Sequence, residues 1–149
     1  MRQMYKTFSY ICAEFEIIIR MTPHSCLLSL GSNYYRTANL AYAHRDLVKH
    51  FPDIHFGIEM ETQAIGSRFL SPFSNQLARF STLLSIEEVR SILKSIEKKN
   101  GRLPEDKMYG VVRIDIDLLK YDDCVLKPED MEREFVRNHT SLDNFPLLS

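Results

Sequence analysis

The hydrophobic periodicity of the chain alternates between strand-like and helix-like segments from residue 26 to residue 119. A short apolar run at 26–30 ends at a Gly-Ser-Asn turn signal and predicts a buried strand. Residues 37–50 repeat their apolar positions at helical spacing, with Thr37 as the predicted N-cap. Residues 54–61 alternate apolar and polar side chains, which is typical of a half-buried strand.

The following residues repeat this order of elements. Residues 73–82 predict another strand after a loop at 63–72. Ser85 and Glu88 form a capping box, in which the hydroxyl and the carboxylate each bind the other residue's free backbone amide, so a helix begins there. The helix is expected to end at Gly101, because glycine readily adopts the left-handed conformation of a helix C-terminus.

A polar loop at 102–110 and a last strand at 111–119 complete the order strand, helix, strand, strand, helix, strand. This order predicts an α+β, ferredoxin-like βαββαβ fold, with two helices on one face of an antiparallel sheet. The other face remains available for a ligand or another partner. Residues 120–149 lack clear periodicity and are expected to wrap around the preceding elements. Together, residues 21–149 are expected to form a single domain.

The N-terminal residues 1–20 precede this pattern. Their apolar stretch at 8–19 is interrupted by Glu14 and Glu16, and it is shorter than the ~20 residues that a membrane-spanning helix needs. We hypothesise that residues 1–20 are an upstream extension and that Met21 is the native start. An additional N-terminal helix or strand is an equally weighted alternative.

Charge and cysteine content argue against several classes of protein. The 149 residues contain 19 Lys and Arg and 20 Asp and Glu, so a net charge of −1 gives no basic excess for nucleic acid. The three cysteines form no CxxC pair, which makes a disulfide framework or a four-thiolate zinc site improbable. We expect a cytoplasmic protein that binds neither nucleic acid nor membrane, and the sequence leaves its oligomeric state open.

The last predicted strand carries two carboxylates, Asp115 and Asp117, separated by one residue. Alternation along a strand places both on one face, with Cα atoms about 6.6–7 Å apart, and Arg113 is expected to share that face. A cation between the carboxylates would relieve their repulsion, and such oxygen ligands suit Mg²⁺. On this motif alone, a solvated strand face is the more common explanation.

Three further side chains are candidates for ligand contacts. Glu97 and Arg102 lie at the end of the second helix, where Arg102 could place a guanidinium near a polyphosphate. Asn75 stands within a strand, where Asn is unfavourable, and could read the edge of a heterocycle with one donor and one acceptor. The alternatives are an ordinary cation in the last helical turn and a surface amide on an edge strand.

Taken together, these motifs resemble the 6-hydroxymethyl-7,8-dihydropterin pyrophosphokinase family. The matching stretches are, in chain order, LLSLGSN at 27–33, Asn39-Leu40, Thr62 with Gly66, Asn75, SIEKKNGR at 95–102, RIDIDLLKYDD at 113–123 and, more weakly, Arg133-Glu-Phe135-Val. Each motif is weak by itself, but their order and spacing are specific. The resemblance covers residues 26–136 and agrees with the fold predicted from periodicity.

The resemblance implies transfer of pyrophosphate from ATP to the hydroxymethyl group of the reduced pterin, with release of AMP, in folate synthesis. It implies two Mg²⁺ ions held by Asp115 and Asp117, with Arg102 and Arg113 as further catalytic residues. The residues implied to bind the pterin are Thr62, Phe73, Asn75 and Phe135. Those implied to bind the nucleotide are Glu97, Arg102, Lys107, Tyr109 and Arg133.

The chain departs from the family's pattern around the last strand. The family usually has GPRTIDLDIL where this chain has GVVRIDIDLL, so the proline is absent and Arg113 lies one residue later than the usual arginine, which it is expected to replace. The preceding loop normally carries several arginines and a Trp, whereas LPEDKMYG at 103–110 has only Lys107 as a cation and Tyr109 at the Trp position. The family's His after the last strand is Glu129.

These departures leave three functional hypotheses. The first is an active enzyme with a rebuilt loop, and the second is a catalytically weakened homologue that binds pterin or nucleotide. The third is a ferredoxin-like regulatory or interaction module without a ligand.

Overall fold

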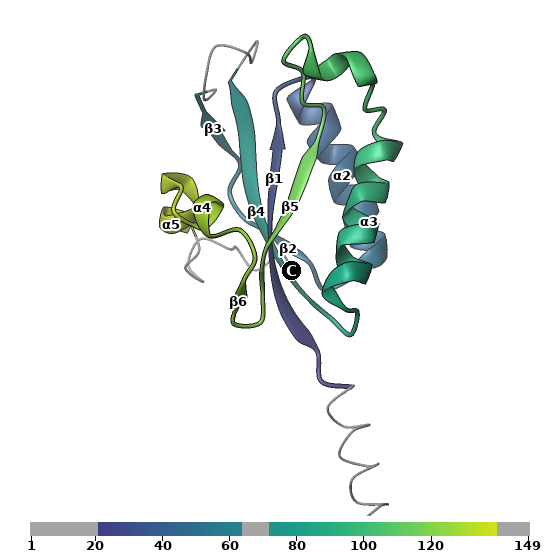
Figure 1. Cartoon of the computed structure of the whole chain (residues 1–149), viewed down its shortest axis with the longest axis vertical. Coiled ribbons are helices and arrows are strands. Elements are labelled where there is room, and N and C mark those ends of the chain that lie inside the picture. The colour runs from purple at the N-terminus through teal and green to yellow at the C-terminus, as the bar shows by residue number, and fades with distance from the viewer. Residues whose placement is uncertain (1–20, 64–71, 140–149) are drawn as a thin grey trace, which may run out of the picture.

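The computed structural model describes residues 21–63 and 72–139, so the hypothesis about residues 1–20 concerns a segment outside the described residues. The family motif residue Gly66 and the end of the C-terminal tail also lie outside them. The elements, shown in Figure 1, are β1 (His24–Ser32), α2 (Arg36–His50), β2 (His55–Phe56), β3 (Met60–Thr62), β4 (Phe73–Thr82), α3 (Ile86–Lys99), the 3-10 turn η1 (Pro104–Lys107), β5 (Asp115–Tyr121), β6 (Cys124–Val125), α4 (Pro128–Met131) and α5 (Glu134–His139).

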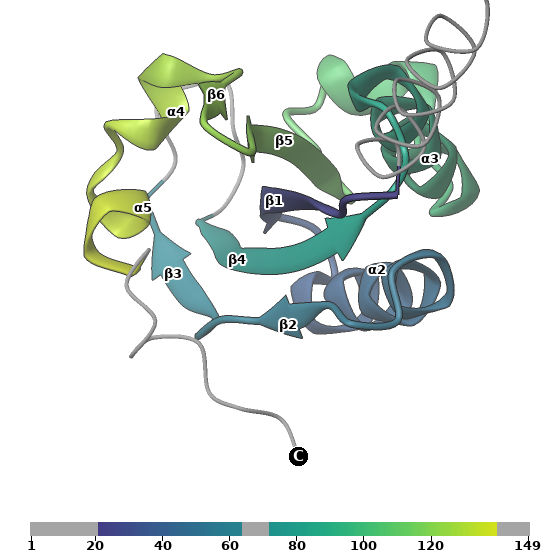
Figure 2. The same cartoon turned by 90° about the horizontal axis from the view of Figure 1, so that it is seen from below.

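The strands form one antiparallel sheet in the order β2-β4-β1-β5-β6, and β3 also pairs with β4. Helices α2 and α3 lie on one face of this sheet, whereas the short helices α4 and α5 lie on the other (Figure 2). The predicted α+β fold with two helices covering one face is therefore confirmed. No helix within the described ranges has the length and apolar content that a membrane span requires.

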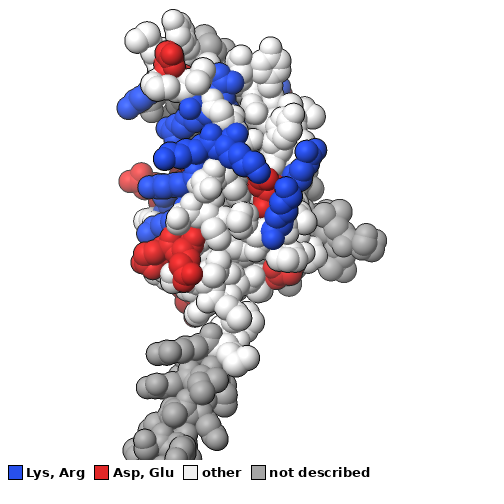
Figure 3. All heavy atoms as spheres, turned by 90° about the vertical axis from the view of Figure 1, so that its right-hand side faces the viewer, with Lys and Arg blue, Asp and Glu red and all other residues white. Residues whose placement is uncertain are grey.

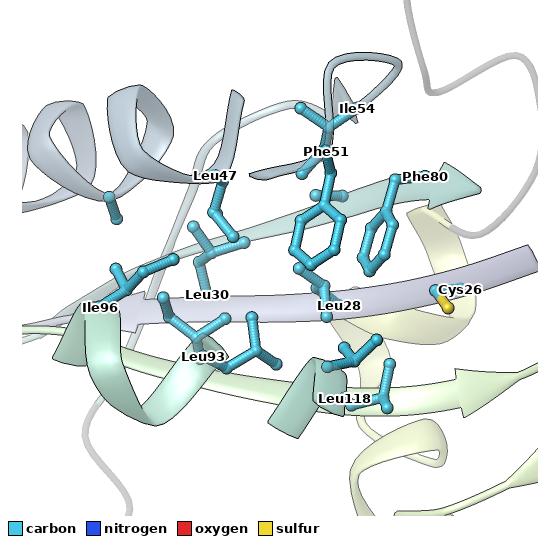
Figure 4. Packing of buried hydrophobic residues seen from close by; sticks show 14 of the residues in the cluster. Cys26, Leu28, Leu30, Leu47, Phe51, Ile54, Phe80, Leu93, Ile96 and Leu118 are labelled. Atoms are coloured by element: carbon cyan, nitrogen blue, oxygen red, sulfur yellow. The ribbon is translucent and has the colours of Figure 1, made fainter. Parts of the chain in front are cut away.

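The main hydrophobic core fills the space between the sheet and helices α2 and α3 (Figure 4). Strand β1 contributes Leu28 and Leu30, both fully buried, because alternate residues of a strand point to the same face. The rings of Phe51 and Phe80 stack with their centroids 3.9 Å apart. This packing leaves the intervening residues of β1 to face the opposite side of the sheet.

Helix α3 begins and ends as the sequence predicts. Oγ of Ser85 accepts a hydrogen bond from the backbone amide of Glu88 at 3.2 Å, and the Glu88 carboxylate accepts one from the Ser85 amide at 3.2 Å. At the other end, Gly101 has φ +85°, the left-handed conformation expected there. The helix therefore stops just before Arg102, and its last turn places Glu97 against β5.

Two predicted boundaries in the first half of the chain are wrong. Helix α2 has its N-cap at Tyr35, with φ 40°, instead of at Thr37. The helix begins two residues earlier than predicted because Nδ2 of Asn39 donates a hydrogen bond to the Tyr34 carbonyl. The predicted strand 54–61 is split into β2 and β3. Their pairing with β4 leaves one extra residue on the β2–β3 side, which is the geometry of a bulge.

The last strand also differs from its prediction at 111–119. It begins at Asp115, because the backbone of Val112 is held by Asn33, whose amide donates to the Val112 carbonyl at 3.0 Å and whose Oδ1 accepts from the Val112 amide at 2.6 Å. Arg113 therefore precedes the strand and does not obey its alternation. The expectation that Arg113 shares a strand face with Asp115 is corrected accordingly.

The segment after β5 folds back across the sheet face that α2 and α3 leave uncovered. A second buried cluster forms there, in which Phe135 and Val136 of α5 pack on Leu27, Leu77 and Leu119 of the sheet. This cluster covers only one end of the face. The described residues leave a cavity at the other end of the face, and the predicted site residues of the strands lie there.

Candidate active site

The end of the sheet that bears the cavity is organised by strand pairing around Gly31. Gly31 of β1 pairs with Asn75 of β4 on one side and with Asp115 of β5 on the other, and Ser29 pairs with Asp117. Directly paired residues of antiparallel strands point to the same face, so Asn75 and both carboxylates project away from α2 and α3. A Cβ on Gly31 would lie 3.2 Å from Oδ1 of Asn75, so glycine leaves room for this amide.

These side chains line a cavity of about 460 Å³. Residues 111–114 before β5, Arg102 beyond the end of α3, and Asp130 and Arg133 in and after α4 complete its wall. Seven of the site residues predicted from the sequence line it, which are Phe73, Asn75, Arg102, Arg113, Asp115, Asp117 and Arg133. The other lining residues are Ser29, Gly31, Val111, Val112, Ile114 and Asp130.

The two carboxylates at one side of the cavity disfavour each other's charge. The Asp115 side chain is exposed at the cavity, where partial loss of hydration, together with the charges of Asp117 and Glu97, raises the pKa of Asp115 to about 7. Glu97 is held nearby because its Oε1 accepts a hydrogen bond from the amide of Ile116 at 2.8 Å. A divalent cation would relieve this repulsion.

The donor set fits Mg²⁺ that arrives with a phosphate-bearing ligand. Among the described residues, no group of three or more His, Cys, Asp or Glu side chains is arranged to hold a metal ion by itself. Mg²⁺ commonly takes one or two carboxylates and fills its remaining positions with water and substrate phosphate oxygens. Asp115 and Asp117 supply that number of protein ligands.

Four cationic side chains surround the carboxylates. Arg102 is the most exposed of them and lies 3.9 Å from Glu97. Arg113 is bound to Asp106 at 2.9 Å, and Arg133 lies over the ring of Phe135 at 5.0 Å. The fourth is Lys127, described next.

Lys127, Asp106 and Tyr34 are neighbours of the site that the sequence did not predict. Nζ of Lys127 lies 3.3 Å from Oδ1 of Asp117, and the charge of that carboxylate raises the pKa of Lys127. Its only sequence signal is its place before Pro128, where the family has a Pro-His pair. Asp106 and Tyr34 both contact Arg113, and they belong to segments that carry no motif.

The predicted pterin residues are only partly brought together. Nδ2 of Asn75 donates a hydrogen bond to Oγ1 of Thr62, so these two lie side by side, and Phe73 lines the same cavity. Asn75 is 4% exposed on a strand flanked by β1 and β3, so the edge-strand alternative is wrong. Phe135 is buried in the second hydrophobic cluster and does not line the cavity.

Three of the predicted nucleotide residues, Glu97, Lys107 and Tyr109, do not line this cavity. Lys107 lines a neighbouring cavity of about 380 Å³, which shares Arg102, Val111 and Val112 with the first. Tyr109 is 61% exposed and lines neither cavity. The arrangement as a whole places an amide, an aromatic ring, three carboxylates and several cations around one space, which suits a heterocycle beside a polyphosphate.

Comparison with known proteins gives a family. A solved structure that is similar to the chain is a designed protein, LFR1 1, with a ferredoxin fold; it is 13% identical, the match covers 63% of this chain and 81% of that one, and the TM-score is 0.27. No protein with curated annotation matches the chain. The profile of the family described as 7,8-dihydro-6-hydroxymethylpterin-pyrophosphokinase (HPPK) matches residues 27–141, which include every residue of the cavity. The chain therefore belongs to the 7,8-dihydro-6-hydroxymethylpterin-pyrophosphokinase family.

Proposed function

We propose that this chain transfers pyrophosphate from ATP to the hydroxymethyl group of 6-hydroxymethyl-7,8-dihydropterin in a Mg²⁺-dependent reaction in the cytoplasm. The family is one of pyrophosphokinases of folate biosynthesis, so the proposal adds the substrates, the ion and the location. The observation that carries it is the single cavity in which Asn75 and Phe73 adjoin Asp115, Asp117 and their cations.

The pterin would occupy the Asn75 end of the cavity. The Asn75 amide offers one acceptor and one donor, and its Nδ2 is already oriented by Thr62. Phe73 supplies an apolar face for the flat ring. Phe135 supports Arg133 from behind the cavity instead of stacking on the pterin.

The reaction would take place where the pterin's hydroxymethyl oxygen reaches the carboxylate pair. This oxygen bonds to the β-phosphorus of ATP while the bond from that phosphorus to the α,β-bridging oxygen breaks, so AMP leaves and the hydroxyl proton passes to solvent. Such transfer depends on positioning and charge neutralisation. Arg102, Arg113 and Arg133 would bind the phosphate oxygens. When bound at Asp115 and Asp117, Mg²⁺ supplies neutralisation of the developing phosphate charge.

The direct test is AMP release from ATP in the presence of Mg²⁺ and the reduced hydroxymethylpterin. We expect release that requires all three components and is lost in Asp115→Asn. A matched control is Asp123→Asn, which removes one carboxylate from an exposed turn outside the cavity. AMP release that continues without the pterin would contradict the proposed substrate.

A weakened homologue is the second candidate. It is favoured by the loop 103–110, whose one cation, Lys107, lines the neighbouring cavity instead of the cavity that holds the carboxylates. Loss of a charge-assisted contact costs about 1.5–3 kcal/mol, so two missing arginines would slow transfer by several powers of ten. Tight binding of both ligands without AMP release would favour this candidate over the active enzyme.

A further inference from the structure

The guanidinium of Arg113 is held on two sides. Its Nε donates to Oδ2 of Asp106 at 2.9 Å and its Nη2 lies 3.4 Å from Oδ1 of the same carboxylate, so Asp106 binds one edge of the group. The ring of Tyr34 lies against its face, with Cζ of Arg113 4.7 Å from the ring centroid. The Arg113 side chain is 23% exposed, and that remaining surface borders the cavity.

Asp106 is itself fixed by the turn that contains it. Its Oδ2 also accepts a hydrogen bond from the Leu103 amide at 2.9 Å, and its backbone carbonyl accepts one from Val111 at 2.8 Å. The hydrogen bond from Arg113 is the main reason why the pKa of Asp106 is lowered. The carboxylate is therefore oriented by Leu103 and Arg113, and Arg113 favours its ionised form.

The backbone just before Arg113 is restrained as well. Nδ2 of Asn33 donates to the Gly110 carbonyl at 2.8 Å, and its Oδ1 accepts from the Val112 amide. These bonds join the end of the loop to the end of β1. Arg113 thus starts from a fixed backbone and ends in a fixed guanidinium, although it lies outside the regular strand.

This restraint distinguishes Arg113 from the other cations of the cavity. Arg102 has a side chain that is 68% exposed, and the ammonium of Lys127 lies against Asp117. Arg133 has a ring contact with Phe135 but is in none of the ion pairs found among the described residues. A guanidinium has five N–H donors, of which Asp106 engages those on one edge, so the remaining donors can meet phosphate oxygens. Ordering this side chain before the ligand binds removes an entropic cost from binding.

We propose that Asp106 and Tyr34 are positioning residues, which hold Arg113 at the cavity to bind the polyphosphate of the nucleotide. The inference rests on the proposed function, because it takes ATP as the ligand. It gives Asp106 and Tyr34, which the sequence analysis did not single out, a role in the site. It also explains how an arginine displaced by one residue along the sequence can serve the same cavity.

The test is a double-mutant cycle read by nucleotide affinity. The probe is the Mg²⁺ complex of an ATP analogue with a methylene group between the α- and β-phosphorus, titrated calorimetrically into the full chain. We expect Arg113→Gln to weaken its binding by about 10–100-fold, the equivalent of one charge-assisted contact. Asp106→Asn should weaken it by about 3–10-fold in the parent and have no effect in the Arg113→Gln background, since Asp106 acts through Arg113.

Three further measurements separate positioning from mere stability. Tyr34→Phe keeps the ring and should bind like the parent, whereas Tyr34→Leu should bind about 3-fold more weakly. Binding of the pterin alone should not change in any of these variants. Lys and Arg side chains gather on the side of the molecule that α2 and α3 form (Figure 3). Arg45 is an exposed residue of α2 outside the cavity, so Arg45→Gln, which removes an equal charge, should leave nucleotide affinity unchanged.

Each outcome bears on the inference. An Asp106→Asn effect that persists in the Arg113→Gln background, or an Arg113→Gln variant with parental affinity, would overturn it while leaving the proposed function intact. A parent chain that binds no nucleotide would overturn the proposed function and this inference together.

Discussion

Replacing Asp115 by Asn should stabilise the metal-free protein, whereas the same change at Asp117 should be nearly neutral. Both substitutions keep the side-chain volume and remove one of two repelling charges. They differ because Asp117 has a compensating partner, Lys127, at 3.3 Å, and no described ion pair involves Asp115. The structure thus separates two carboxylates that are equivalent in the sequence pattern.

The expected size follows from the spacing of the pair. Residues two apart on a strand have Cα atoms about 6.6–7 Å apart, and two charges at about that distance repel by about 0.6–2.5 kcal/mol for effective dielectric constants of about 80 to 20. Because Asp115 opens to water in the cavity, we expect about 1 kcal/mol, or a melting temperature higher by about 2–4 °C. In Asp117→Asn, loss of the Lys127 pair offsets this gain by about 0.2–1 kcal/mol.

The effect should depend on pH with a definite sign. The pKa of Asp115 is raised from 3.8 to about 7, so between these values the folded protein retains a proton that the unfolded chain has released. The contribution of Asp115 to the free energy of unfolding of the parent should therefore become more favourable as the pH falls from 8 to 5.5. The advantage of Asp115→Asn should be present at pH 8 and disappear at pH 5.5.

The assay is thermal unfolding in EDTA and in Mg²⁺ with ATP, at both pH values, for the parent and the two variants. We expect the ligand to raise the melting temperature of the parent and to do so much less in either variant. A lower melting temperature for Asp115→Asn in EDTA at pH 8 would refute the reasoning, because it would mean that the charge of Asp115 is stabilised by the fold.

Three other predictions concern residues whose surroundings the structure defines. Asn75→Ala should weaken pterin binding by about 1–3 kcal/mol and also lower the free energy of unfolding by about 1 kcal/mol, because Asn75 is buried against Thr62. Pterin titration and urea unfolding measure the two effects, and a loss of stability alone would mean that Asn75 has only a structural role. Lys127→Gln should strengthen the binding of Mg²⁺ in the absence of ATP, because it removes the ammonium beside Asp117, and an unchanged Mg²⁺ titration would contradict this. Phe135→Ala should lower the free energy of unfolding by about 3–5 kcal/mol, whereas Phe135→Leu should cost much less; normal stability with lost pterin binding would restore Phe135 as a stacking residue.

Local sequence determined the elements that depend only on neighbouring residues. The start of α3 was predictable because Ser85 and Glu88 satisfy each other's backbone amides within one turn. The shared face of Asp115 and Asp117 was likewise predictable, since side chains alternate along a strand, whereas the alignment of Asn75 with them depends on how β4 and β5 pair with β1. These two rules account for the start of α3 and for the carboxylate pair of the cavity.

The periphery of the site was decided by tertiary contacts. Arg113 leaves the strand because Asn33, distant in sequence, takes the backbone hydrogen bonds of Val112. Lys127 reaches Asp117 because the chain turns back after β5, and Phe135 turns away from the cavity because Leu27, Leu77 and Leu119 offer it a dry surface.

The physical reason for this division is the range of the interactions. Periodicity and capping are properties of a few consecutive residues, so the sequence by itself determined the two helices, the paired strands and the face that carries the carboxylates. The partner of a charged or aromatic side chain depends on which distant segment is brought near it. Only the tertiary structure therefore decided that Asp106 and Tyr34 hold Arg113, that Lys127 faces Asp117 and that Phe135 belongs to the core.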